Sequence, residues 1–286
     1  LCDRRQRQMC IRDSARIVSG CTNPNTKLVS WIHIEQHTKE LASKSFRSYK
    51  EALDCYSKFD RTVCVSDTVK DDFESIFDTK KSVEVLYNTN ESEKIKKLSD
   101  EKVDDVNFSK DIINIISVAK IVPSKGYDRL MKIHKKLIEK NIKNHIYILG
   151  IGEEKEKYEK YLAENNLTDT FTFLGYRDNP YKYVKKADLY VCSSRREGFS
   201  TAVTEALIVG TPVVSTNCSG AYELLGKNNE YGIVTENNED ALYEGIKKML
   251  TTPDLLEAYA SKAKERGKAF STEKTVKAVE EMLSAL

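Results

Sequence analysis

The 286-residue chain has the composition of an ordinary globular protein, with 40% hydrophobic and 31% charged residues. Its 46 Lys and Arg nearly balance its 44 Asp and Glu, which argues against a nucleic-acid-binding protein with a dominant basic field. No apolar run reaches the roughly 18 residues of a membrane span, and the first residues lack a signal-peptide pattern. Seven cysteines without a Cys-x-x-Cys pair are typical of reduced core thiols. These features predict a cytoplasmic protein whose contact with membranes, if it has one, is peripheral.

The chain opens with LCDRRQRQMCIRDS, which has neither helical nor strand periodicity. It starts with Leu1 instead of Met, and the stretch resembles translated adapter sequence. We therefore interpret residues 1–14 as foreign to the fold and the chain as a fragment.

Short β-rich apolar runs then alternate with charged helical segments, a pattern that predicts βαβ units around a parallel sheet. In residues 15–90 we expect a long polar helix from about Gln36 and a shorter one from about Asp67. The strands expected there cover residues 27–34, 61–66 and 82–87. Three strands make an incomplete sheet, so we interpret residues 15–90 as the remnant of an N-terminal, acceptor-side Rossmann-like domain.

Residues 91–110 are rich in Lys, Glu, Asp and Ser and are expected to connect two domains. Residues 111–286 hold a second series of elements that can complete a doubly wound half. Its expected strands cover residues 112–119, 145–149, 170–174, 189–194, 212–215 and 232–235, and its last helices cover residues 239–250, 253–268 and 272–286. The sequence thus predicts an α/β protein with an incomplete N-terminal and a complete C-terminal Rossmann-like domain.

Ligands of open parallel sheets bind at the carboxyl ends of the strands, so the loops there are candidate sites. After the first strand of the second series, Lys120 and Lys125 precede Gly126 and a helix. Two cations, a helix N-terminus and a glycine that lets the backbone approach can bind a diphosphate, although two solvated lysines also fit the pattern. Further on, a glycine-bent turn at Gly175 and Tyr176 suits either a nucleobase or simple packing.

The loop GIGEEK, at residues 150–155, begins like a dinucleotide fingerprint. Lys155 occupies the position of the third glycine, where close packing of helix on strand excludes a long side chain. This departure counts against an NAD-dependent enzyme and favours a plain glycine-eased turn.

Residues 193–206, SSRREGFSTAVTEA, carry the most informative pattern. A glycine-containing turn precedes a helix that Ser200 or Thr201 can cap. Glu197 and Glu205 bracket the helix N-terminus, where a phosphate would bind, and each carboxylate can accept hydrogen bonds from a pair of sugar hydroxyls. Solubility alone would explain Glu197 but not the whole group.

This segment resembles the Glu-(x)7-Glu motif of retaining glycosyltransferase family 4, which has the GT-B fold. The spacing from Glu197 to Glu205 matches, as do the continuation ALIVGTPVV and the earlier Lys-Gly loop. The similarity extends in the right order from about residue 27 to the C-terminus. The leading β-α units of the family, with their glycine-rich loop, have no counterpart in this sequence.

The resemblance implies a role for each matching residue of the segment 193–206. Glu205 would hold the donor ribose, and Glu197 would contact the transferred sugar. Backbone amides of the intervening turn would face the sugar and the diphosphate, namely those of Gly198, Phe199 and Ser200.

The resemblance also implies roles for three residues outside that segment. Lys125 would bind the diphosphate, and Lys120 replaces the family's usual arginine, which keeps the charge but loses the bidentate geometry. His33, at the end of an expected strand, would reach the donor sugar, although a satisfied histidine at a sheet end also fits. Residues 63–66 match the strand and serine before a family helix, and residues 86–88 match the interdomain hinge.

The implied reaction moves a sugar from a nucleoside-diphosphate sugar to a hydroxyl of a glycan or lipid-linked acceptor, with retention of configuration at the anomeric carbon. The donor nucleotide is expected to be UDP, because UDP-sugars are the usual donors of the family. Surface polysaccharide or glycolipid synthesis is the expected setting. We expect no metal or other cofactor, because no Asp-x-Asp or His/Cys cluster is placed for an ion. The alternatives are another GT-B enzyme, such as a UDP-sugar epimerase, and a non-catalytic nucleotide-sugar-binding fragment. Four basic residues could contact an anionic membrane, but a solvated face is the interpretation that we favour: Lys39, Lys44, Arg47 and Lys50.

Overall fold

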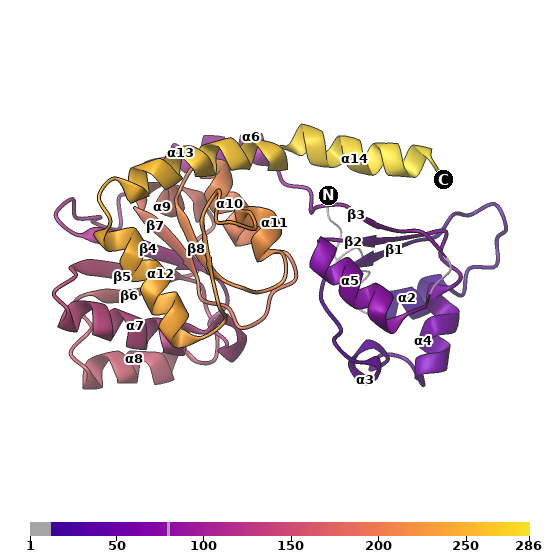
Figure 1. Ribbon diagram of the computed structural model, residues 1–286, viewed down its shortest axis with the longest axis horizontal. Helices are drawn as coiled ribbons and strands as arrows, with labels where there is room; N and C mark the ends of the chain where they lie inside the picture. The colour runs from indigo at the N-terminus through magenta and orange to yellow at the C-terminus, as the bar shows by residue number, and fades with distance from the viewer. Residues whose placement is uncertain (1–12, 79–80) are drawn as a thin grey trace. The chain divides into compact units, whose positions relative to one another are not determined.

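The computed structural model describes residues 13–78 and 81–286, which form two compact units (Figure 1). The first unit comprises Leu1–Asn88 and Thr275–Leu286, and the second comprises Thr89–Lys274. Most of the segment that we interpreted as foreign, residues 1–12, lies outside the described residues. Its last two residues begin helix α2 (Asp13–Val18), which packs on helix α4 through an ion pair of 3.1 Å between Arg16 and Glu51. The interpretation of residues 1–14 as foreign stays a prediction.

The first unit is built on a parallel sheet in the order β1-β2-β3, with β1 (Val29–Ile32), β2 (Arg61–Cys64) and β3 (Val83–Val85). The long helix expected from Gln36 is wrong, because two short helices stand there: α3 (Lys39–Ala42) and α4 (Tyr49–Tyr56). Each begins at its own cap, where the Thr38 and Ser48 hydroxyls accept backbone N–H bonds of 3.2 and 3.1 Å. Helix α5 (Asp67–Ile76), expected after the second strand, is capped by Ser66.

The second unit contains six parallel strands in the order β6-β5-β4-β7-β8-β9. Every expected strand is present within two residues of its predicted ends. The strands are β4 (Ile113–Val118), β5 (Asn144–Leu149), β6 (Phe171–Gly175), β7 (Leu189–Cys192), β8 (Val213–Thr216) and β9 (Ile233–Thr235). Both faces of this sheet are covered, which explains why its strands read as continuous apolar runs.

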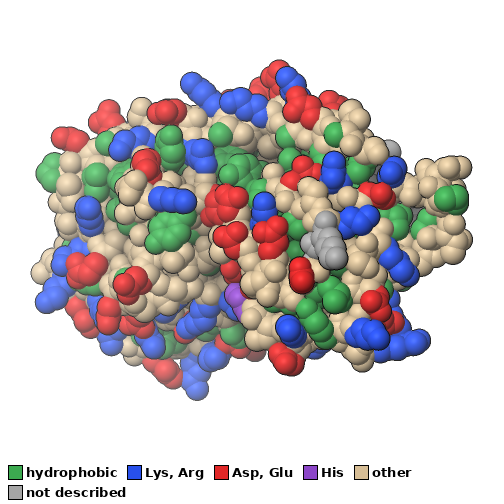
Figure 2. Space-filling view, turned by 45° about the vertical axis from the view of Figure 1, so that its right-hand side comes forward, with side chains coloured by type: hydrophobic (Ala, Val, Ile, Leu, Met, Phe, Trp, Pro, Cys, Tyr) green, Lys and Arg blue, Asp and Glu red, His purple; other side chains and the backbone are tan. Residues whose placement is uncertain are grey.

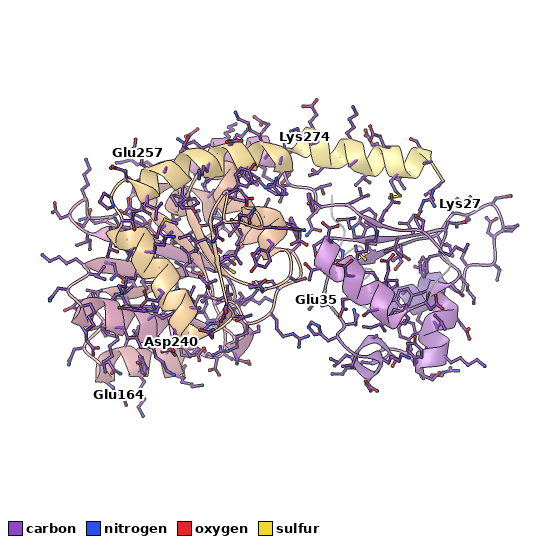
Figure 3. All side chains as sticks on the ribbon, viewed as in Figure 1. Lys27, Glu35, Glu164, Asp240, Glu257 and Lys274 are labelled. Atoms are coloured by element: carbon purple, nitrogen blue, oxygen red, sulfur yellow. The ribbon has the colours of Figure 1, made fainter. Side chains whose placement is uncertain are left out.

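Two layers of helices cover the sheet of the second unit (Figure 1). One face carries α7 (Tyr127–Glu139), α8 (Lys155–Glu164) and α12 (Glu239–Thr251), and the other carries α6 (Ser92–Ser99), α9 (Tyr181–Lys186), α10 (Thr201–Val209) and α13 (Leu255–Gly267). Lys136 of α7 joins two helices of the first layer, because it pairs with Glu239 at 3.0 Å and with Asp240, labelled in Figure 3, at 3.2 Å. The remaining elements are η1 (Pro123–Lys125), α11 (Ala221–Leu225), η2 (Lys268–Phe270) and α14 (Thr272–Ser284).

Residues 91–110, expected as a connection, fold as part of the second unit. Helix α6 packs on α9 and α10, and the Tyr183 hydroxyl donates a 2.8 Å hydrogen bond to Asp105. The division of the chain thus falls after Asn88, and helix α14 begins in the second unit and ends in the first.

Among the described residues, no helix is both long enough and apolar enough to cross a membrane. Figure 2 shows basic and acidic side chains interspersed over the visible face, as the near balance of charges leads one to expect.

Candidate functional site

The strand order of the second unit defines where a ligand can bind. Counted from β4, the order is 3-2-1-4-5-6, the arrangement of a dinucleotide-binding Rossmann domain. Its topological switch point lies between β4 and β7, where the chain leaves one strand toward β5 and the other toward β8. Loops at the carboxyl ends of these two strands diverge and leave a crevice.

A cavity of about 300 Å³ lies at this switch point. Its walls come from the end of β4 and the loop after it, from the end of β7 and the loop after it, and from the first turn of α10. The lining residues are Ser117, Val118, Ala119, Lys120, Lys125, Tyr127, Tyr190, Cys192, Ser194, Glu197, Phe199, Ser200, Thr201 and Ala202. Five of the ten predicted site residues are therefore brought together here: Lys120, Lys125, Glu197, Phe199 and Ser200.

The two lysines of the β4 loop differ in their surroundings. Lys125 closes the 3-10 turn η1 and places Nζ 2.6 Å from Glu197 Oε1. Lys120 is exposed and makes no ion pair within the part of the chain that the structure describes. The cavity thus contains one neutralised and one uncompensated cation.

Glu197 is held by two donors at the same oxygen. The Ser194 hydroxyl donates to Oε1 at 2.6 Å, and Lys125 donates to Oε1 at 2.6 Å. The Glu197 side chain is 14% exposed, so this pairing takes place in a shielded part of the cavity. Because both donors bind one oxygen, Oε2 is the atom left for a ligand hydroxyl.

Helix α10 begins at the cavity and presents its N-terminus there. The Ser200 hydroxyl accepts the backbone N–H of Val203 at 3.4 Å, as the sequence predicts for the cap. The first turn holds no acidic residue, so its partial positive charge is not offset by the helix itself. Phe199 is buried, with its ring centroid 6.1 Å from that of Phe270, which anchors the turn. This end of α10 suits an anionic group.

Glu205 lies one helical turn beyond Thr201, on the same face of α10, but does not line the cavity itself. The Tyr181 hydroxyl donates to its Oε1 at 3.4 Å. Burial raises the pKa of Glu205 to about 7. A carboxyl group that lies next to a cavity and has a pKa near neutral pH is a candidate ligand-binding group.

Gly126 has a packing role in addition to the one expected from the sequence, and the expected approach of its backbone to a diphosphate stays a prediction. It adopts a φ of +69° at the start of α7, and a Cβ there would lie 2.1 Å from the Ser193 carbonyl oxygen. The close approach is between the β4 and β7 loops. Gly126 therefore shapes the cavity by letting its two walls meet.

Tyr176 and His33 are not among the residues that line the cavity. Tyr176 follows β6, and its side chain is 66% exposed. His33 belongs to the first unit, where it directly follows β1 and is half-buried, and burial lowers its pKa. Gly198, in the turn between Glu197 and Phe199, is half-buried and is absent from the lining as well.

The sequence analysis missed Arg129, which is important to this geometry. Arg129 of α7 is buried and donates to the carbonyls of Ser193 and Ser194, and Ser194 in turn holds Glu197. An arginine in a charged helix is usually expected to be solvent-exposed, so only its proximity to Gly126 could have drawn attention to it.

Among residues 13–78 and 81–286, no group of three or more His, Cys, Asp or Glu is placed to hold a metal ion.

The fold and cavity together define an α/β protein that can bind a phosphate-bearing ligand at the switch point of a Rossmann-like unit. The sequence model of the family Glycosyl transferases group 1 matches residues 99–266, which include the entire cavity. The chain belongs to this family.

Known proteins similar to this chain are also glycosyltransferases. An N-acetylgalactosamine-N,N'-diacetylbacillosaminyl-diphospho-undecaprenol 4-alpha-N-acetylgalactosaminyltransferase of Campylobacter jejuni is 34% identical over 66% of this chain. The aligned part spans only 50% of that relative's length. An uncharacterized glycosyltransferase of Methanocaldococcus jannaschii is 30% identical over 88% of this chain and 70% of its own length.

Solved structures confirm the GT-B fold with its parallel-sheet α/β units. The complex of Anabaena Alr3699/HepE with UDP aligns with a TM-score of 0.79 and 17% identity, over 96% of this chain and 77% of that one. Staphylococcus aureus TarM, in a complex that includes UDP, aligns with a TM-score of 0.71 and 22% identity, over 90% of this chain and 51% of that one. At these identities the likeness concerns the fold alone.

Proposed function

We propose that this glycosyltransferase binds a UDP-linked sugar in the switch-point cavity and transfers the sugar, with retention, to a hydroxyl of a glycan or lipid-linked acceptor. The observation that carries the proposal is the meeting of Lys120, Lys125 and the N-terminus of α10 at one cavity. In support, the Campylobacter relative is named for a diphospho-undecaprenol-linked substrate, and the Anabaena structure holds UDP.

The cationic side of the cavity is suited to the diphosphate. Lys120 and Lys125 supply full charges, and α10 supplies amide N–H groups and the positive end of its dipole. These groups stabilise the negative charge that develops on UDP as the bond to the sugar breaks, without any reorganisation of solvent. This is the chief electrostatic demand of sugar transfer.

The carboxylates and the remaining predicted residues would orient the donor. We assign the transferred sugar to Glu197, whose Oε2 is left for a hydroxyl, and the ribose to Glu205. The backbone amides of Gly198, Phe199 and Ser200 would contact the sugar and the diphosphate. Tyr176, exposed after β6, would contact the nucleobase, and His33 would contact the donor sugar.

Calorimetric titration of UDP and UDP-sugars tests the donor assignment. We expect the wild-type chain to bind UDP and Glu205→Ala to bind it about tenfold or more weakly, because the substitution removes a charge-assisted hydrogen bond. Glu164→Ala is the matched control, because Glu164 ends α8, which covers the other face of the sheet from α10 (Figure 3). No heat with any nucleoside diphosphate, from folded protein, would overturn the proposal. Equal affinities of Glu205→Ala and wild type would overturn only the role of Glu205.

The fate of the sugar separates transfer from related reactions. Incubation with a UDP-sugar and a hydroxyl acceptor should release UDP, and proton NMR of the product should show the anomeric configuration of the donor. An altered sugar that remains attached to UDP would favour the UDP-sugar epimerase alternative. Binding without any turnover would favour the non-catalytic alternative.

A further inference from the structure

Arg129 joins helix α7 to the loop that carries Glu197. Only 5% of Arg129 is exposed, and its guanidinium donates from Nε to the Ser193 carbonyl at 2.8 Å and from Nη2 to the Ser194 carbonyl at 2.7 Å. A further bond from Nη2 reaches the Ser193 carbonyl. One side chain thereby ties down two consecutive carbonyls at the end of β7.

This guanidinium lacks the usual compensation for a buried charge. Among the described residues no carboxylate pairs with Arg129, because the neighbouring Asp128 makes a bidentate pair with Arg195, at 2.7 Å for each bond. Burial lowers the pKa of Arg129. An apolar side chain would fill the same space without this desolvation cost. What the arginine adds is a fixed geometry for the loop.

The fixed loop leads directly to the ligand-binding groups of the cavity. Ser194, whose carbonyl Arg129 binds, donates its hydroxyl to Glu197 at 2.6 Å. Ser193, whose carbonyl Arg129 also binds, donates its hydroxyl to the Lys125 carbonyl at 2.8 Å. Arg129 is therefore linked to Glu197 through Ser194 and to Lys125 through Ser193.

We propose that Arg129 is a positioning residue for donor binding, which sets Glu197 and Lys125 through the backbone of residues 193–194. It acts without lining the cavity. The inference rests on the proposed function in so far as the positioned groups bind a UDP-sugar. The ordering of this loop by the buried guanidinium does not depend on which ligand the cavity binds.

Arg129→Met tests the proposal, with Arg266→Met as the matched control. Arg266 of α13 also donates to two consecutive carbonyls, those of Glu223 and Leu224, but these belong to α11 and not to the loop after β7. Hydrogen exchange followed by mass spectrometry should show faster exchange of residues 193–199 in Arg129→Met, including the Arg195 amide, which is bonded to the Ser124 carbonyl at 2.7 Å. Arg266→Met should leave that segment unchanged.

The ratio of UDP-sugar affinity to UDP affinity separates positioning from mere stabilisation. Misplacing Glu197 and Lys125 together should lower the affinity for the UDP-sugar by about tenfold. The affinity for UDP, which has no sugar for Glu197 to bind, should fall by less, whereas partial unfolding lowers both in proportion. Should Arg129→Met fail to fold, Arg129→Lys, which keeps the charge but not the forked geometry, should show the same changes to a smaller degree. Wild-type exchange of residues 193–199 in these variants would overturn the proposal. Failure of the wild-type chain to bind any UDP-sugar would overturn the proposed function. Hydrogen exchange of residues 193–199 would then still test whether Arg129 orders the loop.

Discussion

Lys125 Nζ and Glu197 Oε1 lie 2.6 Å apart inside the cavity, so the two charged groups assigned to the diphosphate and to the sugar neutralise each other before a donor arrives. On the proposed assignment, a diphosphate competes with Glu197 for Lys125. Once Lys125 binds the diphosphate, Glu197 Oε1 keeps the Ser194 hydroxyl as its donor and has room to accept a sugar hydroxyl in addition to Oε2. We therefore expect the binding of the two halves of the donor to be coupled through this ion pair.

Glu197→Gln should raise the affinity for UDP and lower the rate of sugar transfer. The neutral amide no longer competes for Lys125, so we expect UDP to bind about fivefold more tightly, the effect of removing one ion pair of about 1 kcal/mol. Glu153→Gln, a change of an exposed carboxylate in the β5 loop, should alter neither quantity. Weaker UDP binding by Glu197→Gln would mean that Glu197 holds Lys125 in place more than it competes for it.

Donor binding should depend on pH through Glu205. Burial raises the pKa of Glu205 to about 7, above its ordinary value of 4.5, so the group is protonated in the free protein at pH 6 and ionised at pH 8. The carboxylate is the better acceptor for ribose hydroxyls. We therefore expect UDP affinity to rise from pH 6 to pH 8 more steeply in the wild type than in Glu205→Gln, and binding at pH 7 to release protons. Because UDP also titrates in this range, the difference between the two proteins is the informative quantity. Parallel pH profiles would contradict the assignment.

The same shift has a consequence for folding with the opposite dependence on pH. A carboxyl whose folded-state pKa is raised keeps its proton in the folded state after the unfolded chain has lost it. The contribution of Glu205 to the free energy of unfolding should therefore fall as the pH rises from 4.5 to 7, and Glu205→Gln should remove this contribution. Urea denaturation of both proteins across that window measures the difference.

Gly126→Ala should destabilise the second unit far more than Gly175→Ala. Both glycines have positive φ values, +69° and +74°, so both substitutions strain the backbone. At Gly126 the new Cβ would lie 2.1 Å from the Ser193 carbonyl oxygen, whereas at Gly175 the nearest atom is 3.9 Å away. We expect losses in the free energy of unfolding of about 3 kcal/mol and about 1 kcal/mol, respectively, measured by urea denaturation. Equal losses would show that the β4 and β7 loops separate easily.

The sequence predicted the strands of the second unit well, because short apolar runs such as those of β4 and β7, each between polar segments, are typical of strands buried on both faces of a sheet. It also located the cavity, since Lys120 and Glu197 each follow a strand whose end lies at the switch point. The division of the expected helix after Gln36 was not foreseen, because the caps Thr38 and Ser48 stand in a polar stretch where such residues are common. The pairing of Lys125 with Glu197 joins residues 72 positions apart and depends on side-chain geometry that no local pattern contains.

Lys120 is the cavity cation that we expect to respond most simply to substitution, because it has no ion-pair partner among the described residues to rearrange. Lys120→Ala should weaken UDP binding by about tenfold and reduce its dependence on salt, since one charge–phosphate contact is lost. Lys120→Arg should bind UDP at least as tightly as the wild type, because a forked donor can hold two phosphate oxygens. Lys186→Ala, a change of an exposed lysine at the end of α9, is the control for net charge and should match the wild type. Titrations at two salt concentrations measure all four proteins. Indistinguishable affinities of Lys120→Ala and Lys186→Ala would show that the diphosphate is bound by Lys125 and the α10 amides alone.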